Sequence, residues 1–208
     1  MHSILKYAGK VEAYPFPHVV IENAHDDYDA LASSFPMVQH KGGNNLRRYL
    51  DSTRTKGPIA EFFKYHTSRS FADEVCDLFD VARFKPDKMV GHVSVNTPVL
   101  KRSSVKGPHL DHSSKFWQGL FYMPVAEDTA GGDLQFYDCP EPRLANTAVY
   151  GRAVVNHGDP VKRIPYLANL FVCYLNSRAA VHGVSEREVT GLLRRYINLS
   201  IIRSVRHK

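Results

Sequence analysis

The sequence predicts a mainly β protein with α-helices, in which a helical cover over residues 1–88 precedes a β core over residues 89–208. Apolar rows at helical spacing occur in the first part, whereas short runs rich in Val, Ile, Phe and Tyr, separated by Gly, Pro, Asn and Asp, fill the second. The chain has 208 residues, of which 43% are hydrophobic and 23% charged, as in globular proteins with a real core. The sequence shows no repeat or linker, so we expect a single domain over 1–208.

The first part predicts one short strand and two helical stretches. Prolines precede the apolar run at 19–21, which favours a strand, and an apolar row from Tyr28 to Phe35 at helical spacing is ended by Pro36. The polar, glycine-containing segment 39–56 predicts a loop. Pro58 then opens a longer helix, whose apolar face is formed by Ile59, Phe62, Phe63, Phe71, Val75 and Leu78.

The second part predicts an antiparallel β-sandwich or barrel. Its short apolar runs are separated by turn-forming residues, which is the pattern of such sheets. The expected strands cover 89–95, 116–125, 132–138, 153–156, 170–175 and 196–202.

The charge, the cysteines and the apolar runs indicate which partners and which cellular compartment to expect. The formal net charge is +6, but the basic residues are scattered, so most of them are expected on a solvated face. The three cysteines, Cys76, Cys139 and Cys173, are far apart and show no CxxC spacing, which argues against disulfides or a structural zinc site and favours a reducing compartment. No apolar run approaches the ~20 residues of a membrane span, and the first residues carry no secretion signal. We therefore expect a cytoplasmic protein without a membrane partner.

A His-x-Asp pair and a distant histidine predict a metal site. In an extended chain His109 and Asp111 point to the same face and can bind one ion. The motif is short, and by itself it is more often a surface pair or a capping Asp. His182 follows the predicted buried strand 169–175 in small, apolar surroundings. Two histidines and one carboxylate form the facial triad that suits Fe(II), although a His182 that is merely satisfied in the core remains the alternative.

The last predicted strand carries a candidate anion-binding arginine. If residues 194–202 are extended, Arg195 shares a face with the apolar row Ile197, Leu199 and Ile201, which should point to the interior. An unpaired buried charge is costly, and a guanidinium pairs well with a carboxylate. A dicarboxylate such as 2-oxoglutarate would fit, with its keto-acid end on the metal. An internal salt bridge is the alternative, and Arg194 lies on the polar face.

Taken together, these segments resemble a known family. HLD at 109–111, GGDLQFYD at 131–138, NLFVCYLNSRAAVHGV at 169–184 and RRYINLSI at 194–201 are similar to the prolyl-hydroxylase-like branch of the Fe(II)/2-oxoglutarate oxygenase superfamily. The resemblance implies a double-stranded β-helix (jelly-roll, cupin-like) core with the N-terminal helices packed on one side. It also implies Fe(II), 2-oxoglutarate and O₂ as cofactor and co-substrates.

The resemblance assigns further residues and leaves some choices open. It places Tyr122 beside the arginine, on the far carboxylate of 2-oxoglutarate, although Tyr122 is equally explained as an aromatic that lines the barrel. The segment 185–190 lengthens the interval after His182, so the choice between Arg194 and Arg195 stays open. Other histidines compete less well as ligands: these are His112, which points away in an extended chain, and His157, in a turn-like segment.

The implied reaction is hydroxylation of an unactivated C–H bond, with release of succinate and CO₂. The substrate would be a small molecule, such as an amino acid or a natural-product intermediate, or a peptidyl proline, selected by segments 39–55, 99–107 and 139–165. A non-catalytic cupin-like binding protein is the alternative. A nucleic-acid demethylase is less favoured and nucleic acid is not an expected partner, because Ile201 stands where that branch carries a second arginine.

Overall fold

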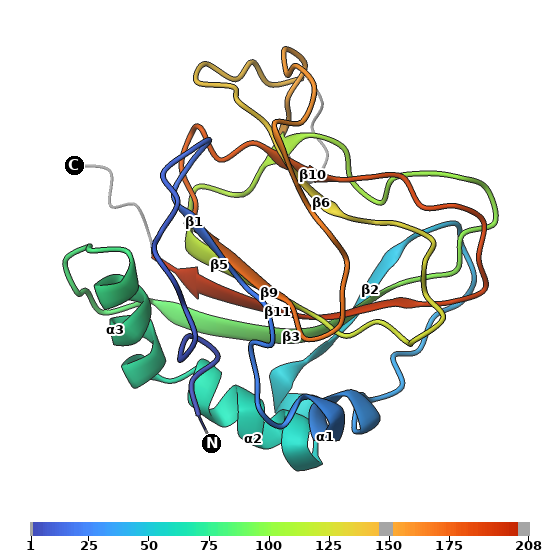
Figure 1. The fold of residues 1–208 in the computed structure, drawn as a ribbon, viewed down its shortest axis with the longest axis horizontal. Helices are drawn as coiled ribbons and strands as arrows, with labels where there is room; N and C mark the ends of the chain where they lie inside the picture. Colours follow the sequence, from blue (N-terminus) through green and yellow to red (C-terminus); the bar gives the residue numbers. More distant parts are fainter. Residues whose placement is uncertain (1, 146–151, 204–208) are drawn as a thin grey trace.

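Two antiparallel sheets face each other, and the helices cover the outer face of the larger sheet (Figure 1). The computed structural model describes residues 2–145 and 152–203. The larger sheet has the strand order β1-β9-β5-β11-β3-β2, and the smaller one has the order β7-β4-β10-β6-β8. The predicted mainly β fold with N-terminal helices on one side is therefore confirmed. Part of the predicted selectivity segment 139–165, namely 146–151, lies outside the described residues.

The larger sheet consists of β1 (His18–Ile21), β2 (Arg47–Asp51), β3 (Lys88–Asn96), β5 (Lys115–Tyr122), β9 (Phe171–Leu175) and β11 (Arg194–Ile202). The smaller sheet consists of β4 (His109–Leu110), β6 (Leu134–Phe136), β7 (Arg152–Ala153), β8 (Lys162–Ile164) and β10 (His182–Val184). The helices are α1 (Tyr28–Ser33), the short 3₁₀ helix η1 (Ser52–Arg54), α2 (Gly57–His66) and α3 (Arg69–Leu78).

The N-terminal part differs from the sequence prediction at two places. The segment 39–56, predicted as a loop, contains β2 and η1. Hydrophobic patterning misses β2 because it is an edge strand whose residues are partly exposed and show no apolar alternation. The predicted long helix is divided into α2 and α3. Its break lies at Ser68, whose hydroxyl accepts a hydrogen bond from the Phe71 backbone N–H and so caps a new helix.

The main apolar core lies between the larger sheet and the helices. On β11, Ile197 is paired with Val93 of β3 and with Phe121 of β5, and all three side chains are buried in this core. The helices approach closely, since a Cβ atom added at Gly91 would lie 2.5 Å from the Phe63 ring of α2. The opposite face of the same strands is therefore left to the space between the two sheets.

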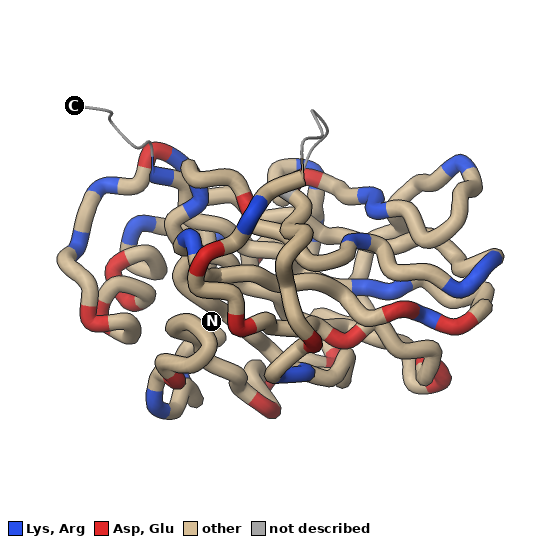
Figure 2. Tube along the Cα trace, turned by 90° about the horizontal axis from the view of Figure 1, so that it is seen from above, with Lys and Arg blue, Asp and Glu red and all other residues tan. Residues whose placement is uncertain are grey.

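The cysteines and the charged residues are distributed as the sequence predicts. Cys76, Cys139 and Cys173 are all buried and free, as the spacing indicated. Lys and Arg occur along the whole length of the described molecule, interspersed with Asp and Glu, so the positive net charge is not gathered on one face (Figure 2).

None of the helices in ranges 2–145 and 152–203 combines the length and the hydrophobicity needed to cross a bilayer.

Candidate metal centre and its cavity

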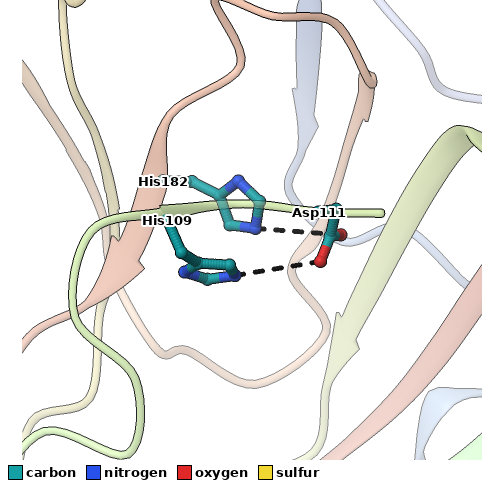
Figure 3. A group of neighbouring side chains, drawn as sticks. All are labelled: His109, Asp111 and His182. Carbon is teal, nitrogen blue, oxygen red and sulfur yellow. Dashed lines mark ion pairs between the residues drawn. The ribbon is translucent and has the colours of Figure 1, made fainter. Parts of the chain in front are cut away.

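The three predicted metal ligands lie together between the sheets. His109 of β4 and His182 of β10 are directly paired in the antiparallel register, and their ring centroids are 4.2 Å apart. Asp111, just after β4, faces both rings: its Oδ1 is 3.8 Å from His109 Nε2 and its Oδ2 is 3.9 Å from His182 Nε2 (Figure 3). One ligand atom from each residue lies within 4.8 Å of the others, which fits a shared divalent cation.

Backbone carbonyls hold both imidazoles in the orientation that a metal requires. His109 Nδ1 is 2.8 Å from the carbonyl oxygen of Gly107, and His182 Nδ1 is 2.9 Å from that of Ala180. Because a carbonyl only accepts hydrogen bonds, each Nδ1 must donate, and each Nε2 keeps a lone pair for a metal.

The electrostatic surroundings keep the three groups in their metal-binding forms. Burial is the main cause that lowers the pKa of both His109 and His182, so both rings stay neutral. Burial acts to raise the pKa of the Asp111 carboxyl, but the positive charges around it, among them Lys115 and Lys106, outweigh burial and hold that pKa below its ordinary value. A carboxylate and two neutral imidazoles are the forms that bind Fe(II).

Tyr174 contacts one of these ligand atoms. Its hydroxyl, fully buried on β9, is 2.8 Å from His182 Nε2 and donates to the lone pair that a metal would use. The hydroxyl is thus within reach of any group bound at His182.

Arg194, rather than Arg195, points into the space between the sheets. The Arg194 side chain is buried; its Nε donates to the Gly132 carbonyl at 2.9 Å and its Nη1 is 3.4 Å from Asn96 Oδ1. Its guanidinium lies over the ring of Tyr122, with the Cζ atom 5.1 Å from the ring centroid. Within the described part of the chain, Arg194 Nη2 and the Tyr122 hydroxyl are both buried without a hydrogen-bond partner.

Two unpaired buried polar atoms at one place indicate a ligand with an anionic oxygen. Such atoms are costly and rare in proteins. Burial raises the pKa of Tyr122 to about 12, against the effect of the Arg194 charge, so the hydroxyl remains a donor. A carboxylate could accept from both groups at once. Arg194, the alternative that the sequence left open, shares its face of β11 with Tyr196 and Asn198, which also line the cavity.

The predicted face of Arg195 is wrong. Its Nε donates to the Met123 carbonyl at 3.0 Å, its Nη2 donates to the Ala32 carbonyl at 3.1 Å, and its guanidinium lies over the Phe35 ring. The apolar row of β11 does face the main core, but this core lies on the helix side of the sheet. The Arg195 side chain points to the same side as that apolar row, and its hydrogen bond to the Ala32 carbonyl connects β11 to the end of α1.

A cavity of about 140 Å³ joins the triad to Arg194. Its lining includes the cationic residues Arg47, Lys106, Lys115 and Arg194, and Asp111 as the carboxylate. The competing histidines are not part of it: His112 is exposed and bonds Ser114, and the His157 ring packs on Tyr137.

Comparison with known proteins extends the description of the fold. No family model matches the sequence, and no curated protein matches it. Among solved structures, a prolyl-4-hydroxylase from Pseudomonas putida is 10% identical, with a TM-score of 0.56 over 90% of this chain and 92% of that one. HygX from Streptomyces hygroscopicus, crystallised with nickel and 2-oxoglutarate, is 13% identical, with a TM-score of 0.57 over 97% and 85%.

A third structure is a prolyl hydroxylase from Trichoplax adhaerens in complex with a peptide fragment of the hypoxia-inducible factor; it is 12% identical, with a TM-score of 0.54 over 89% of this chain and 83% of that one. The chain has the fold of the Fe(II)/2-oxoglutarate oxygenases. The predicted double-stranded β-helix core is thereby confirmed. In this oxygenase fold the two sheets of the present chain enclose the His-Asp-His group and the buried Arg194.

Proposed function

We propose that the protein is an Fe(II)- and 2-oxoglutarate-dependent dioxygenase that hydroxylates an unactivated C–H bond and releases succinate and CO₂. One observation carries the proposal: a metal-ligating triad and a buried guanidinium with an unpaired nitrogen line the same cavity. A facial triad suits Fe(II), and a dicarboxylic keto acid could reach from the metal to the guanidinium.

The roles of the residues follow from their contacts. His109, Asp111 and His182 would hold the iron, and Arg194, in place of Arg195, would bind the far carboxylate of 2-oxoglutarate with Tyr122. When bound, iron and 2-oxoglutarate supply the oxidising chemistry. The protein contributes orientation: carbonyls fix both imidazoles, and the Gly132 carbonyl and Asn96 fix the Arg194 guanidinium.

The finer features of this function are also proposals. The substrate is an amino acid, a natural-product intermediate or a peptidyl proline, handled by a single catalytic domain. A cytoplasmic location is supported by three free cysteines. The candidate from another class, a cupin-like binding protein, would use the same cavity without turnover.

Metal and co-substrate binding followed by succinate release tests the proposal. The purified chain, given Fe(II) and 2-oxoglutarate without oxygen, should develop a weak visible charge-transfer band that His109→Ala abolishes. With oxygen and a panel of amino acids and peptides, succinate should appear in amounts that match the hydroxylated product. Binding without succinate release under every condition would favour the cupin-like alternative.

The metal affinity should depend little on pH between neutral and mildly acidic conditions. Burial lowers the pKa of both His109 and His182, so their neutral forms persist as the pH falls. From about pH 7.5 to pH 6, we expect the affinity for Mn(II) to fall less than about threefold, whereas two imidazoles with ordinary pKa values would lose about tenfold or more. Calorimetric titration measures this, and a tenfold loss would contradict the assigned burial effect.

A further inference from the structure

The cavity carries more positive charge than the proposed cofactors can neutralise. With Fe(II) at the triad and 2-oxoglutarate on Arg194, the charges of the iron, Asp111, Arg194 and the 2-oxoglutarate dianion cancel, since both imidazoles are neutral. The remaining cations that line the cavity are Arg47, Lys106 and Lys115. In the described part of its lining, no carboxylate other than Asp111 is available to balance them.

Arg47 is the cation whose pairing is least complete. It is paired with Asn96 across β2 and β3, and Asn96 is paired with Arg194 across β3 and β11, so the two arginines lie on one face of the sheet. They are two strand spacings apart, each roughly 4.8 Å. Arg47 is exposed to solvent, makes a long contact to Ser94 Oγ at 3.4 Å, and has its guanidinium Cζ 5.9 Å from the centre of the Tyr49 ring; it makes no ion pair with any described residue.

The two lysines differ in how far they are engaged. Lys115 Nζ contacts Asp111 Oδ2 at 3.1 Å and Gln118 Oε1 at 2.9 Å, so it is held within the site. Lys106 Nζ is 3.9 Å from Asp111 Oδ1, at the limit of an ion pair, and part of its side chain is exposed. Lys106 and Arg47 are therefore the cations that remain free to contact a further molecule in the cavity.

We propose that the primary substrate is a small molecule with an oxyanion group, a carboxylate or a phosphate, which Arg47 and Lys106 bind beside the metal. The inference rests on the proposed function and narrows its substrate class. A guanidinium and an ammonium that converge on one cavity bind such groups through charge-assisted hydrogen bonds, which are stronger than neutral ones. A neutral prolyl peptide would leave both cations unpaired.

Charge-matched ligand pairs provide the test. The chain is saturated with 2-oxoglutarate and with Zn(II), which has no redox chemistry, so that Arg194 is occupied and no turnover occurs. Small carboxylates are compared with their primary amides, phosphate monoesters with their parent alcohols, and charged with neutral prolyl peptides, by ligand-observed NMR. The carboxylate and phosphate arms distinguish the two sources of the oxyanion.

The variants have matched controls in the chain. Arg47→Gln and Lys106→Gln should each weaken the bound anions about tenfold, since each removes a charged hydrogen-bond partner. Arg48→Gln changes the next residue on β2, which does not line this cavity, and Lys101→Gln changes an exposed lysine; both should bind the anions as the wild type does.

The affinity for 2-oxoglutarate, measured by calorimetry on the same samples, separates the two levels of the inference. It should be unchanged in Arg47→Gln and Lys106→Gln. Retained 2-oxoglutarate binding with equal binding of neutral and anionic partners would overturn the substrate class alone. A loss of 2-oxoglutarate binding in Arg47→Gln would also overturn it, because Arg47 would then belong to the co-substrate site. Failure of the wild type to bind 2-oxoglutarate would contradict the proposed function itself.

Discussion

Asp111→Ala and His182→Ala are expected to bind Fe(II) at least about 100-fold more weakly than the wild type and to release no measurable succinate from 2-oxoglutarate. Each change removes one of the three proposed ligands, and even the loss of a group that only supports a ligand costs about 10–100-fold in metal affinity. Asp111 also carries the negative charge that balances part of the metal charge and contacts Lys115. Metal affinity is measured by anaerobic calorimetry, and turnover by succinate release.

His112→Ala is the matched control for these variants. His112 lies next to Asp111, but its ring is exposed and bonds Ser114, so the variant should keep both metal binding and turnover. Circular dichroism and thermal unfolding establish that each variant is folded. Full turnover by Asp111→Ala and His182→Ala would mean that the iron site lies elsewhere.

Arg194→Ala is expected to weaken 2-oxoglutarate binding about 100-fold, which corresponds to the loss of one strong charged hydrogen bond. The guanidinium is already oriented by the Gly132 carbonyl and Asn96 and presents its unpaired Nη2 beside the Tyr122 hydroxyl. Metal binding should change much less, because Arg194 is not a ligand. Calorimetric titration of the Zn(II)-loaded protein with 2-oxoglutarate measures the effect.

Arg195→Ala is the comparison that decides between the neighbouring arginines. Arg195 bonds the Met123 and Ala32 carbonyls on the helix side, so its loss should lower the free energy of unfolding by about 1–3 kcal/mol. We expect 2-oxoglutarate affinity within about threefold of the wild type, since the contact removed is not in the cavity. A larger loss of affinity in Arg195→Ala than in Arg194→Ala would contradict the observed face of β11.

The sequence was sufficient to find the residues of the triad but not the side of the sheet on which the site lies. His109 and Asp111 are recognisable because alternation places them on one face whatever covers the strand. For β11, alternation identifies two faces and assigns the apolar one to a core. Alternation does not show that this core lies under the helices, and it therefore favours Arg195 over Arg194 as the residue in the cavity.

Local polar contacts explain the two differences between the predicted and the observed N-terminal elements. The apolar face from Ile59 to Leu78 continues across Ser68, so the pattern predicts one helix. The break is caused by a local hydrogen bond, in which the Phe71 backbone N–H donates to the Ser68 hydroxyl and caps a second helix. Strand β2 has no apolar alternation because it is outermost in its sheet, and its hydrogen bonds to β3 hold it in place. Both features depend on partners that hydrophobic patterning does not describe.

The position of β2 has a consequence for how this scaffold could diversify. The triad is held by β4 and β10, between other strands of the smaller sheet, whereas Arg47 lies on a strand with a neighbour on one side only. An edge strand can change its side chains, or lengthen the connection before it, without rearranging the strands that hold the proposed iron ligands. On the proposed roles, Arg47 places one part of substrate selection on β2, apart from the strands that carry the triad, so we expect substitutions on β2 to alter specificity while the triad stays intact.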